Sequence, residues 1–192
     1  MHTPGHVLLN VAVLGSIVGH ERAVVAGAIV PDLPIVILYL RERLRGTPDD
    51  IIWSVAYQHR GWLALIHGAH SLPLSLLAVL ISALWHAPGL TAFFLSMAAH
   101  ALCDLPLHVH DAHRHFFPFS EFRFRSPISY WDPRYHGRTW SLIEALGVTA
   151  CAIYLYVARA AHWTLSPVLA AGLLGSVVVW YAVNYYRSFL RR

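Results

Sequence analysis

The sequence contains no lysine and few charged residues of any kind. Its fourteen basic residues are all arginines, and only 12% of the 192 residues are charged, whereas 57% are hydrophobic. This composition is too apolar for a water-soluble domain of this length, and it predicts a single membrane-embedded domain over residues 1–192. The two cysteines, Cys103 and Cys151, belong to no Cys-x-x-Cys pair, which argues against thiolate metal sites and redox motifs.

Apolar runs separated by polar segments predict an all-α polytopic membrane bundle. A helix needs roughly 18–20 apolar residues to cross a bilayer. Four runs approach that length and are expected to span, namely residues 71–85, 90–107, 141–160 and 164–186. Two earlier runs, 7–19 and 23–40, are split by a charged tripeptide and predict an N-terminal helical hairpin, either crossing or re-entrant. No basic segment precedes the first run, so a signal peptide is not expected.

The arginines concentrate in residues 41–60, in residues 108–139 and in the C-terminal tail. The positive-inside rule therefore predicts a multi-pass protein of the inner membrane in which both long loops and the C-terminus face the cytoplasm. Contact with anionic lipid headgroups then explains the net charge of +4, and no nucleic-acid partner is expected.

Histidine is unusually abundant: the fourteen histidines outnumber the ten acidic residues. Histidine is the commonest metal ligand in proteins, and it is the side chain whose ordinary pKa lies near neutrality. So many histidines in a membrane chain indicate metal binding or proton handling.

His100 and Asp104 are the most informative pair, because they lie one helical turn apart within an apolar run. A buried polar pair is costly unless something compensates it. A metal ion would do so, and a simple imidazole–carboxylate contact is the alternative. Pro106 then breaks the helix, and a second group follows, consisting of His108, His110, Asp111, His113 and His115.

Three upstream segments offer further candidate ligands. His67 and His70 lie one turn apart where the 71–85 run begins, although interfacial histidines facing water are the alternative. Asp32 follows Pro31 inside an apolar run, where a metal ligand and a helix N-cap are both compatible with the pattern. His6 immediately precedes the first apolar run.

A downstream segment adds a fifth group. Asp132 precedes Pro133 and is expected to be a helix N-cap. His136 and Glu144 lie about two turns apart on one side of the following helix and could share a site. Imidazole and carboxylate ligands without thiolates predict one or two divalent ions, zinc first, with manganese or iron as alternatives.

The order of these motifs resembles that of the YdjM-like inner-membrane proteins, which are described as metal-dependent hydrolases. The resemblance runs from the N-terminus to about residue 145. It is carried by His6, the Gly27–Asp32 segment, His59-Arg60-Gly61, His70-Ser71, His100-xxx-Asp104 and Phe117-Pro118-Phe119-Ser120.

A more distant resemblance is to the zinc-dependent phospholipases C and the related single-strand nucleases. The spacing His100-xxx-Asp104-xxxxx-His110 is similar to their helical motif. His6, Asp32 and His70 occur in the order of their upstream ligands. Trp140 stands where the family's later acidic ligand is expected, and Glu144 follows one turn further. The resemblance therefore implies one or two metal ions rather than three.

Together the two resemblances imply a hydrolase whose metal-bound water attacks a phosphoester, either a small molecule or a membrane lipid. Arg114, Arg123 and Arg125 are the candidate contacts to an anionic headgroup. One alternative is a di-iron lipid hydroxylase or desaturase, because His67-xx-His70 and His110-xx-His113-x-His115 resemble histidine boxes. The non-enzymatic alternative is a metal transporter or a haem-binding membrane protein.

Overall fold

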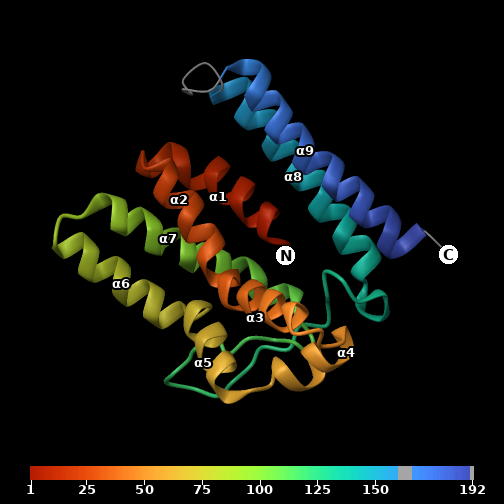
Figure 1. Ribbon diagram of the computed structural model, residues 1–192. Coiled ribbons are helices and arrows are strands. Elements are labelled where there is room, and N and C mark those ends of the chain that lie inside the picture. Colours follow the sequence, from red (N-terminus) through yellow and green to blue (C-terminus); the bar gives the residue numbers. More distant parts are fainter. Residues whose placement is uncertain (160–165, 191–192) are drawn as a thin grey trace.

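The computed structural model describes residues 1–159 and 166–190, which contain helices and loops and no strand (Figure 1). Residues 160–165, where the predicted spans 141–160 and 164–186 meet, lie outside the described residues, as do Arg191 and Arg192. The helical elements are α1 (Thr3–Val18), α2 (Glu21–Ile29), η1 (Val30–Asp32), α3 (Leu33–Leu44), α4 (Asp49–Ile51), η2 (Ile52–Ala56), α5 (Arg60–Ala69), α6 (Leu72–Leu84), α7 (Pro88–Asp104), η3 (Leu105–Leu107), η4 (Pro133–Tyr135), α8 (Gly137–Arg159), α9 (Pro167–Tyr185) and η6 (Tyr186–Leu190).

Within the described residues, four helical segments are long and apolar enough to cross a membrane: Glu21–Leu44, Pro88–Leu107, Gly137–Ala158 and Pro167–Leu190. Three of them correspond to predicted spans. The fourth joins α2, η1 and α3 and contains the run 23–40, which was expected to be half of a hairpin. The hairpin itself is present, because α1 packs against α2, but α1 is short for a crossing.

The predicted span at 71–85 does not stand as a span by itself. It forms the 13-residue helix α6, which meets α5 at a bend of 51°. The bend arises because Ser71 is the N-cap of α6: its hydroxyl accepts a hydrogen bond from the backbone N–H of Leu74 at 3.3 Å, so a new helix begins there.

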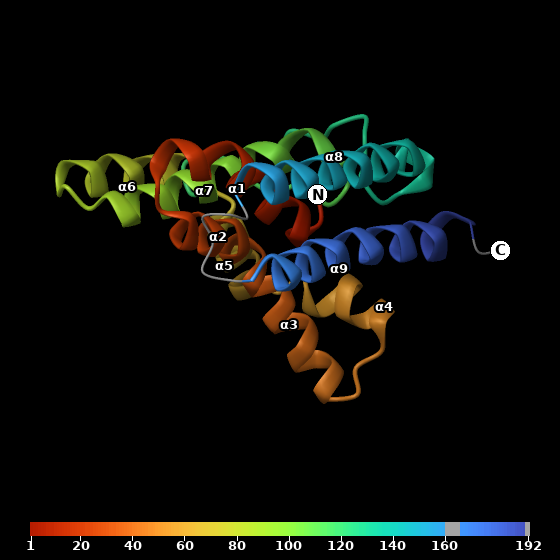
Figure 2. The same cartoon turned by 90° about the horizontal axis from the view of Figure 1, so that it is seen from above.

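Helix α7 lies at the centre of the fold, packed between α2 and α6, while α8 and α9 form an antiparallel pair beside α1 (Figures 1 and 2). The closest contact is between α2 and α7 at Gly27, where an added Cβ would lie 2.1 Å from the carbonyl oxygen of Phe93. Hydrogen bonds tie the same helices together: the Ser96 hydroxyl donates to Val24 O at 2.6 Å, and Asn10 Nδ2 donates to Ser96 O at 2.9 Å. These contacts hold α7 against α1 and α2 in the two turns that precede His100.

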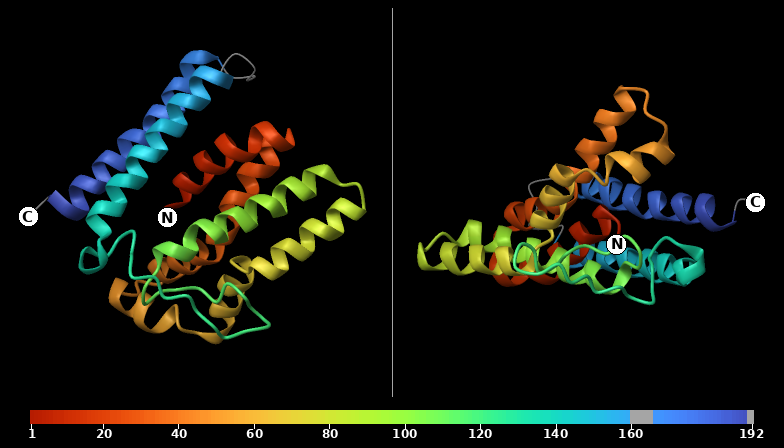
Figure 3. Two further views of the ribbon diagram at one scale, coloured as in Figure 1. Left: turned by 180° about the vertical axis from the view of Figure 1, so that it is seen from behind. Right: turned by 90° about the horizontal axis from the view of Figure 1, so that it is seen from below.

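The segment after α7 is the long loop predicted from its polar composition. It runs from His108 to the short turn η4 and passes beneath α5 and the end of α7 (Figure 3). A backbone hydrogen bond from Leu72 N to His115 O at 2.9 Å attaches the loop to the start of α6, and one from Ser126 N to His108 O at 3.0 Å joins two parts of the loop itself. The loop therefore closes over the ends of the helices that carry the candidate ligands.

Candidate metal centre

Asp32 lies at the break between α2 and α3. Pro31 cannot continue the α-helical hydrogen-bond pattern, and a short 3₁₀ turn results. Although Asp32 occupies the N-cap position of α3, its side chain makes no capping hydrogen bond. Its carboxylate instead accepts a hydrogen bond from the Thr3 hydroxyl and faces His70 and His100. The carboxylate is thus aimed at the interior of the fold and does not act as a helix cap.

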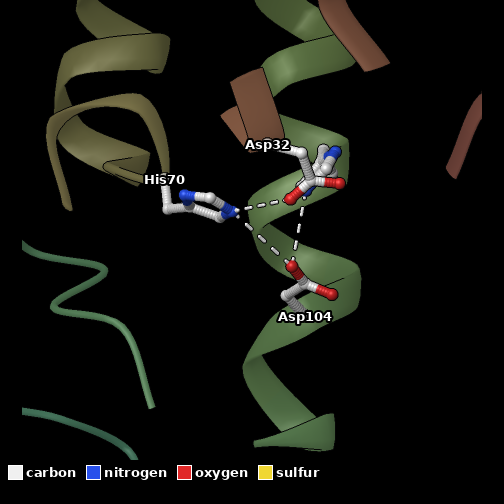
Figure 4. Close-up of side chains that lie close together, drawn as sticks. Asp32, His70 and Asp104 are labelled. Carbon is white, nitrogen blue, oxygen red and sulfur yellow. Dashed lines mark ion pairs between the residues drawn. The ribbon is translucent and has the colours of Figure 1, made fainter. Parts of the chain in front are cut away.

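Asp32, His70, His100 and Asp104 converge on one point, as Figure 4 shows for the three labelled side chains. His70 Nε2 lies 3.6 Å from Asp32 Oδ1 and 3.7 Å from Asp104 Oδ2. His100 Nε2 lies 3.6 Å and 3.4 Å from the same two oxygens. Both histidines and Asp104 are buried, and Asp32 is nearly so. These four residues were each predicted as ligands, from three separate segments of the sequence.

These separations are long for hydrogen bonds and suit ligands of one ion. Zinc binds nitrogen and carboxylate oxygen at about 2.0–2.2 Å, so two ligands at adjacent corners of a tetrahedron lie roughly 3.4 Å apart. Each of the four nitrogen–oxygen distances is between 3.4 and 3.7 Å. The four side chains could therefore be ligands of one metal ion.

The orientation of both imidazole rings supports the same conclusion. His70 Nδ1 lies 2.9 Å from Ile66 O, and His100 Nδ1 lies 2.7 Å from Ala28 O. A carbonyl oxygen only accepts, so each Nδ1 must carry the proton, and each Nε2 then offers a lone pair. Neither Nε2 atom has a hydrogen-bond partner within the described part of the chain. Two buried lone pairs aimed at two carboxylates need a cation or a proton between them.

A second group shares Asp104 with the first and adds His108 and His113. His108 Nδ1 contacts Asp111 Oδ2 at 2.9 Å, and His108 Nε2 lies 3.7 Å from Asp104 Oδ1. Burial alone would lower the pKa of His108, but its contacts with Asp104 and Asp111 hold that pKa above the usual value. Burial by itself would raise the pKa of Asp111, but the contact with His108 lowers the pKa of that carboxyl to about 2. The site thus stabilises positive charge.

His113 differs from His108 in having no carboxylate hydrogen bond. Its ring stacks on that of His70 at a centroid distance of 4.0 Å, and burial holds its pKa well below the ordinary value. It is therefore neutral at pH 7, which is the form that binds a metal. Its Nδ1 is buried and has no partner among the described residues.

His6 lies in contact with the first group without belonging to it. Its Nε2 is 3.0 Å from Asp104 Oδ1, and its ring stacks on that of His100 at 3.5 Å. The amino group of Met1 lies 2.6 Å from the same carboxylate oxygen. Donors thus crowd Oδ1 of Asp104, while Oδ2 faces His70 and His100.

Three predicted ligands lie elsewhere. His110 is exposed and its Nε2 contacts the Tyr135 hydroxyl at 2.9 Å. His136 is exposed, and its left-handed backbone (φ 62°) separates η4 from α8, so it does not share a helix with Glu144. Glu144 is buried and accepts a hydrogen bond from the Tyr181 hydroxyl at 2.6 Å and from His2 N at 2.7 Å. None of the three belongs to either group.

The N-cap predicted at Asp132 is confirmed, for the 3₁₀ turn η4 and not for a long helix. Its carboxylate accepts from Arg134 N at 3.0 Å and from Arg134 Nη2 at 2.7 Å. The Asp132 carboxylate is therefore paired with Arg134 and needs no metal ion to balance its charge.

A cavity of about 630 Å³ adjoins the second group. His108, His113 and Arg123 contribute to its wall, whose remaining part is mostly aromatic and aliphatic. Those other lining residues are Ile35, Trp53, Tyr57, Gln58, Leu63, His110, Asp111, Tyr130 and Trp131. The cavity offers a cation and an apolar surface beside the candidate ligands.

The three arginines proposed as anion contacts are placed differently. Arg123 is held in the cavity wall by Ala112 O at 3.0 Å and lies near His67 Nε2 at 3.3 Å. Arg114 contacts Ser120 O and Glu121 and lies over the Phe117 ring, while Arg125 is exposed. Of these three, only Arg123 lines the cavity.

His108, Asp111 and His113 were noted in the sequence as members of a histidine-rich group. His113 entered only the histidine-box alternative, and none of the three was predicted as a ligand beside Asp104. Only the path of the loop brings them together beside Asp104. Comparison of the chain with protein-family models, with curated proteins and with solved structures gave no match. The function is therefore inferred from the geometry of these residues.

Proposed function

We propose that this protein is a membrane-embedded, metal-dependent hydrolase that cleaves a phosphoester at the cytoplasmic surface of the inner membrane. The observation that carries the proposal is the buried group of Asp32, His70, His100 and Asp104, with two unpartnered Nε2 atoms facing two carboxylates. In the proposed centre these four residues hold a divalent ion, and zinc suits their imidazole and carboxylate donors best.

The chemistry of the proposed reaction is divided between the ion and the chain. A divalent ion held by these four residues with one further coordination position open to water would lower the pKa of that water to about 7 and neutralise charge on a phosphoryl oxygen. Arg123, in the cavity wall, would bind the phosphoryl group through its guanidinium donors. The aromatic and aliphatic part of the cavity would hold the alcohol portion of the substrate, including that of a lipid.

Chelation provides the direct test. The detergent-purified protein should hydrolyse bis(p-nitrophenyl) phosphate or a short-chain phospholipid, lose that activity after dialysis against EDTA, and regain it with zinc. An equivalent carboxylic ester should be a poor substrate. Iron as the bound metal with oxygen-dependent turnover would contradict the proposal, as would metal flux into proteoliposomes without hydrolysis.

Arg123→Ala should raise KM for an anionic phosphoester by about ten-fold or more, because a charge-assisted hydrogen bond contributes about 1.5–3 kcal/mol. Arg125→Ala is the matched control, since Arg125 is exposed and lies outside the cavity wall. Steady-state kinetics on both variants would measure the difference. An equal KM in the two variants would remove Arg123 from substrate binding.

The proposed orientation follows from the arginine distribution and can be tested by labelling. In a background with Cys103→Ala and Cys151→Ala, Glu121→Cys should be protected from an impermeant thiol reagent added outside intact cells, whereas Trp85→Cys should react. Both side chains are exposed in the structure. The reverse pattern would invert the topology and move the centre to the periplasmic side.

A further inference from the structure

We infer that the protein binds a second metal ion through Asp104, His108 and His113, so that Asp104 bridges two ions. The inference rests on the metal centre of the proposed function and extends it. The first argument is the division of the Asp104 carboxylate. Oδ2 faces the first group, 3.4 Å from His100 Nε2, whereas Oδ1 faces the second, 3.7 Å from His108 Nε2.

The second argument is the orientation of the His108 ring. Its Nδ1 lies against the Asp111 carboxylate, so that in the neutral ring Nδ1–H donates to Asp111 and the Nε2 lone pair, the one a metal would take, is directed toward Asp104. His108 Nε2 is buried and has no hydrogen-bond partner in the described residues. Asp111 is held in turn by Trp131 Nε1 at 3.0 Å. A carboxylate behind an imidazole is the usual support of a metal-bound histidine.

The third argument is the surroundings of His113. Its ring is buried against His70, a ligand of the first group, so the two groups are in direct contact. The positive charge now beside Asp104 Oδ1 is the amino group of Met1 at 2.6 Å, which a second cation would displace or join. His6 contacts the same oxygen. Among the described residues, Asp104 is the carboxylate that the two candidate groups share.

The position of the second group explains what the second ion would do. His108 and His113 line the cavity, whereas Asp32, His70 and His100 do not. A second ion would therefore lie on the substrate side of the first. Two adjacent ions can stabilise both the attacking and the leaving oxygen of a phosphoester displacement.

Metal counting and spectroscopy test the inference. Purified wild-type protein loaded with Mn²⁺ should bind two equivalents and give the exchange-coupled EPR signal of a carboxylate-bridged pair. His108→Ala and His113→Ala should each bind one equivalent and give the six-line signal of an isolated ion. His110→Ala is the matched control and should keep two, because His110 is exposed and contacts Tyr135.

Asp111→Asn tests the carboxylate that orients the His108 ring, without removing a proposed metal ligand. It should weaken binding of the second equivalent by about 10–100-fold and leave the first unchanged. This variant also covers the case in which His113→Ala fails to fold. One equivalent in wild type, or two equivalents with a coupled signal in His108→Ala, would overturn the inference. Two coupled ions without any phosphoester hydrolysis would instead overturn the proposed function and leave the second site standing.

Discussion

Asp104→Asn is expected to abolish metal binding and zinc-dependent stabilisation together. Its two oxygens serve both groups, so the substitution removes an anionic ligand from each while preserving the shape of the side chain. A ligand present at 1,000 times its dissociation constant stabilises the folded state by about 4 kcal/mol. Wild-type protein should therefore show a rise in Tm of several degrees on addition of zinc, and Asp104→Asn should show almost none.

Asp132→Asn is the matched control for this experiment. It makes the same change of carboxylate to amide at a buried position, and asparagine also caps a helix or turn. It should keep the wild-type zinc content and the zinc-dependent rise in Tm. Equal zinc content in wild type and Asp104→Asn, measured by elemental analysis after gel filtration, would reject the centre.

The candidate ligands that could be predicted from sequence either share one regular helix or interrupt or border an apolar run. His100 and Asp104 are both within α7, so a spacing of four residues puts them on one face. Asp32 and His70 stand out because each polar side chain interrupts or borders an apolar run. The sequence could not show that Asp32 faces these histidines, since that depends on the packing of α2 against α7 and of α5 against η1 and α3.

The ligands that could not be predicted follow a break in the helix. Extending the spacing beyond Asp104 led to His110, but Pro106 produces the turn η3 and the backbone of His108 is extended. Helical periodicity therefore ends at Asp104 and does not extend to His108 and His113. The histidines that meet Asp104 are His108 and His113, chosen by the path of a loop whose conformation has no periodic pattern.

The candidate membrane spans could likewise be predicted only where an apolar run forms one regular helix. Composition predicts where apolar runs occur, and α7, α8 and α9 lie close to the predicted runs. It does not reveal that Ser71 starts a new helix, so that the run at 71–85 becomes one arm of a bent pair. Nor does it reveal that α2 continues through a 3₁₀ turn into α3. Both breaks lie at candidate ligands: Ser71 follows His70, and the 3₁₀ turn contains Asp32.

Gly27→Ala is expected to have the second large effect, because it acts on the helix contact that positions His100. An added Cβ would lie 2.1 Å from the carbonyl oxygen of Phe93, and a backbone atom cannot move aside as a side chain can. Helices α2 and α7 must therefore separate. Overpacking of this kind typically costs about 1–3 kcal/mol. Ala28 O would also shift relative to His100 Nδ1, which it now holds at 2.7 Å.

Gly147→Ala distinguishes this local effect from the general effect of replacing a helical glycine. Gly147 is exposed in α8, and nothing lies within 4 Å of its added Cβ. Alanine there should leave Tm unchanged or raise it, since alanine favours the helix over glycine by about 1 kcal/mol. Gly27→Ala should lower both Tm and zinc affinity, measured by thermal unfolding and competitive chelation. A lowered Tm with unchanged zinc affinity would mean that the α2–α7 contact stabilises the fold without positioning His100, so the ligand geometry would have to be set by α7 and the loop alone.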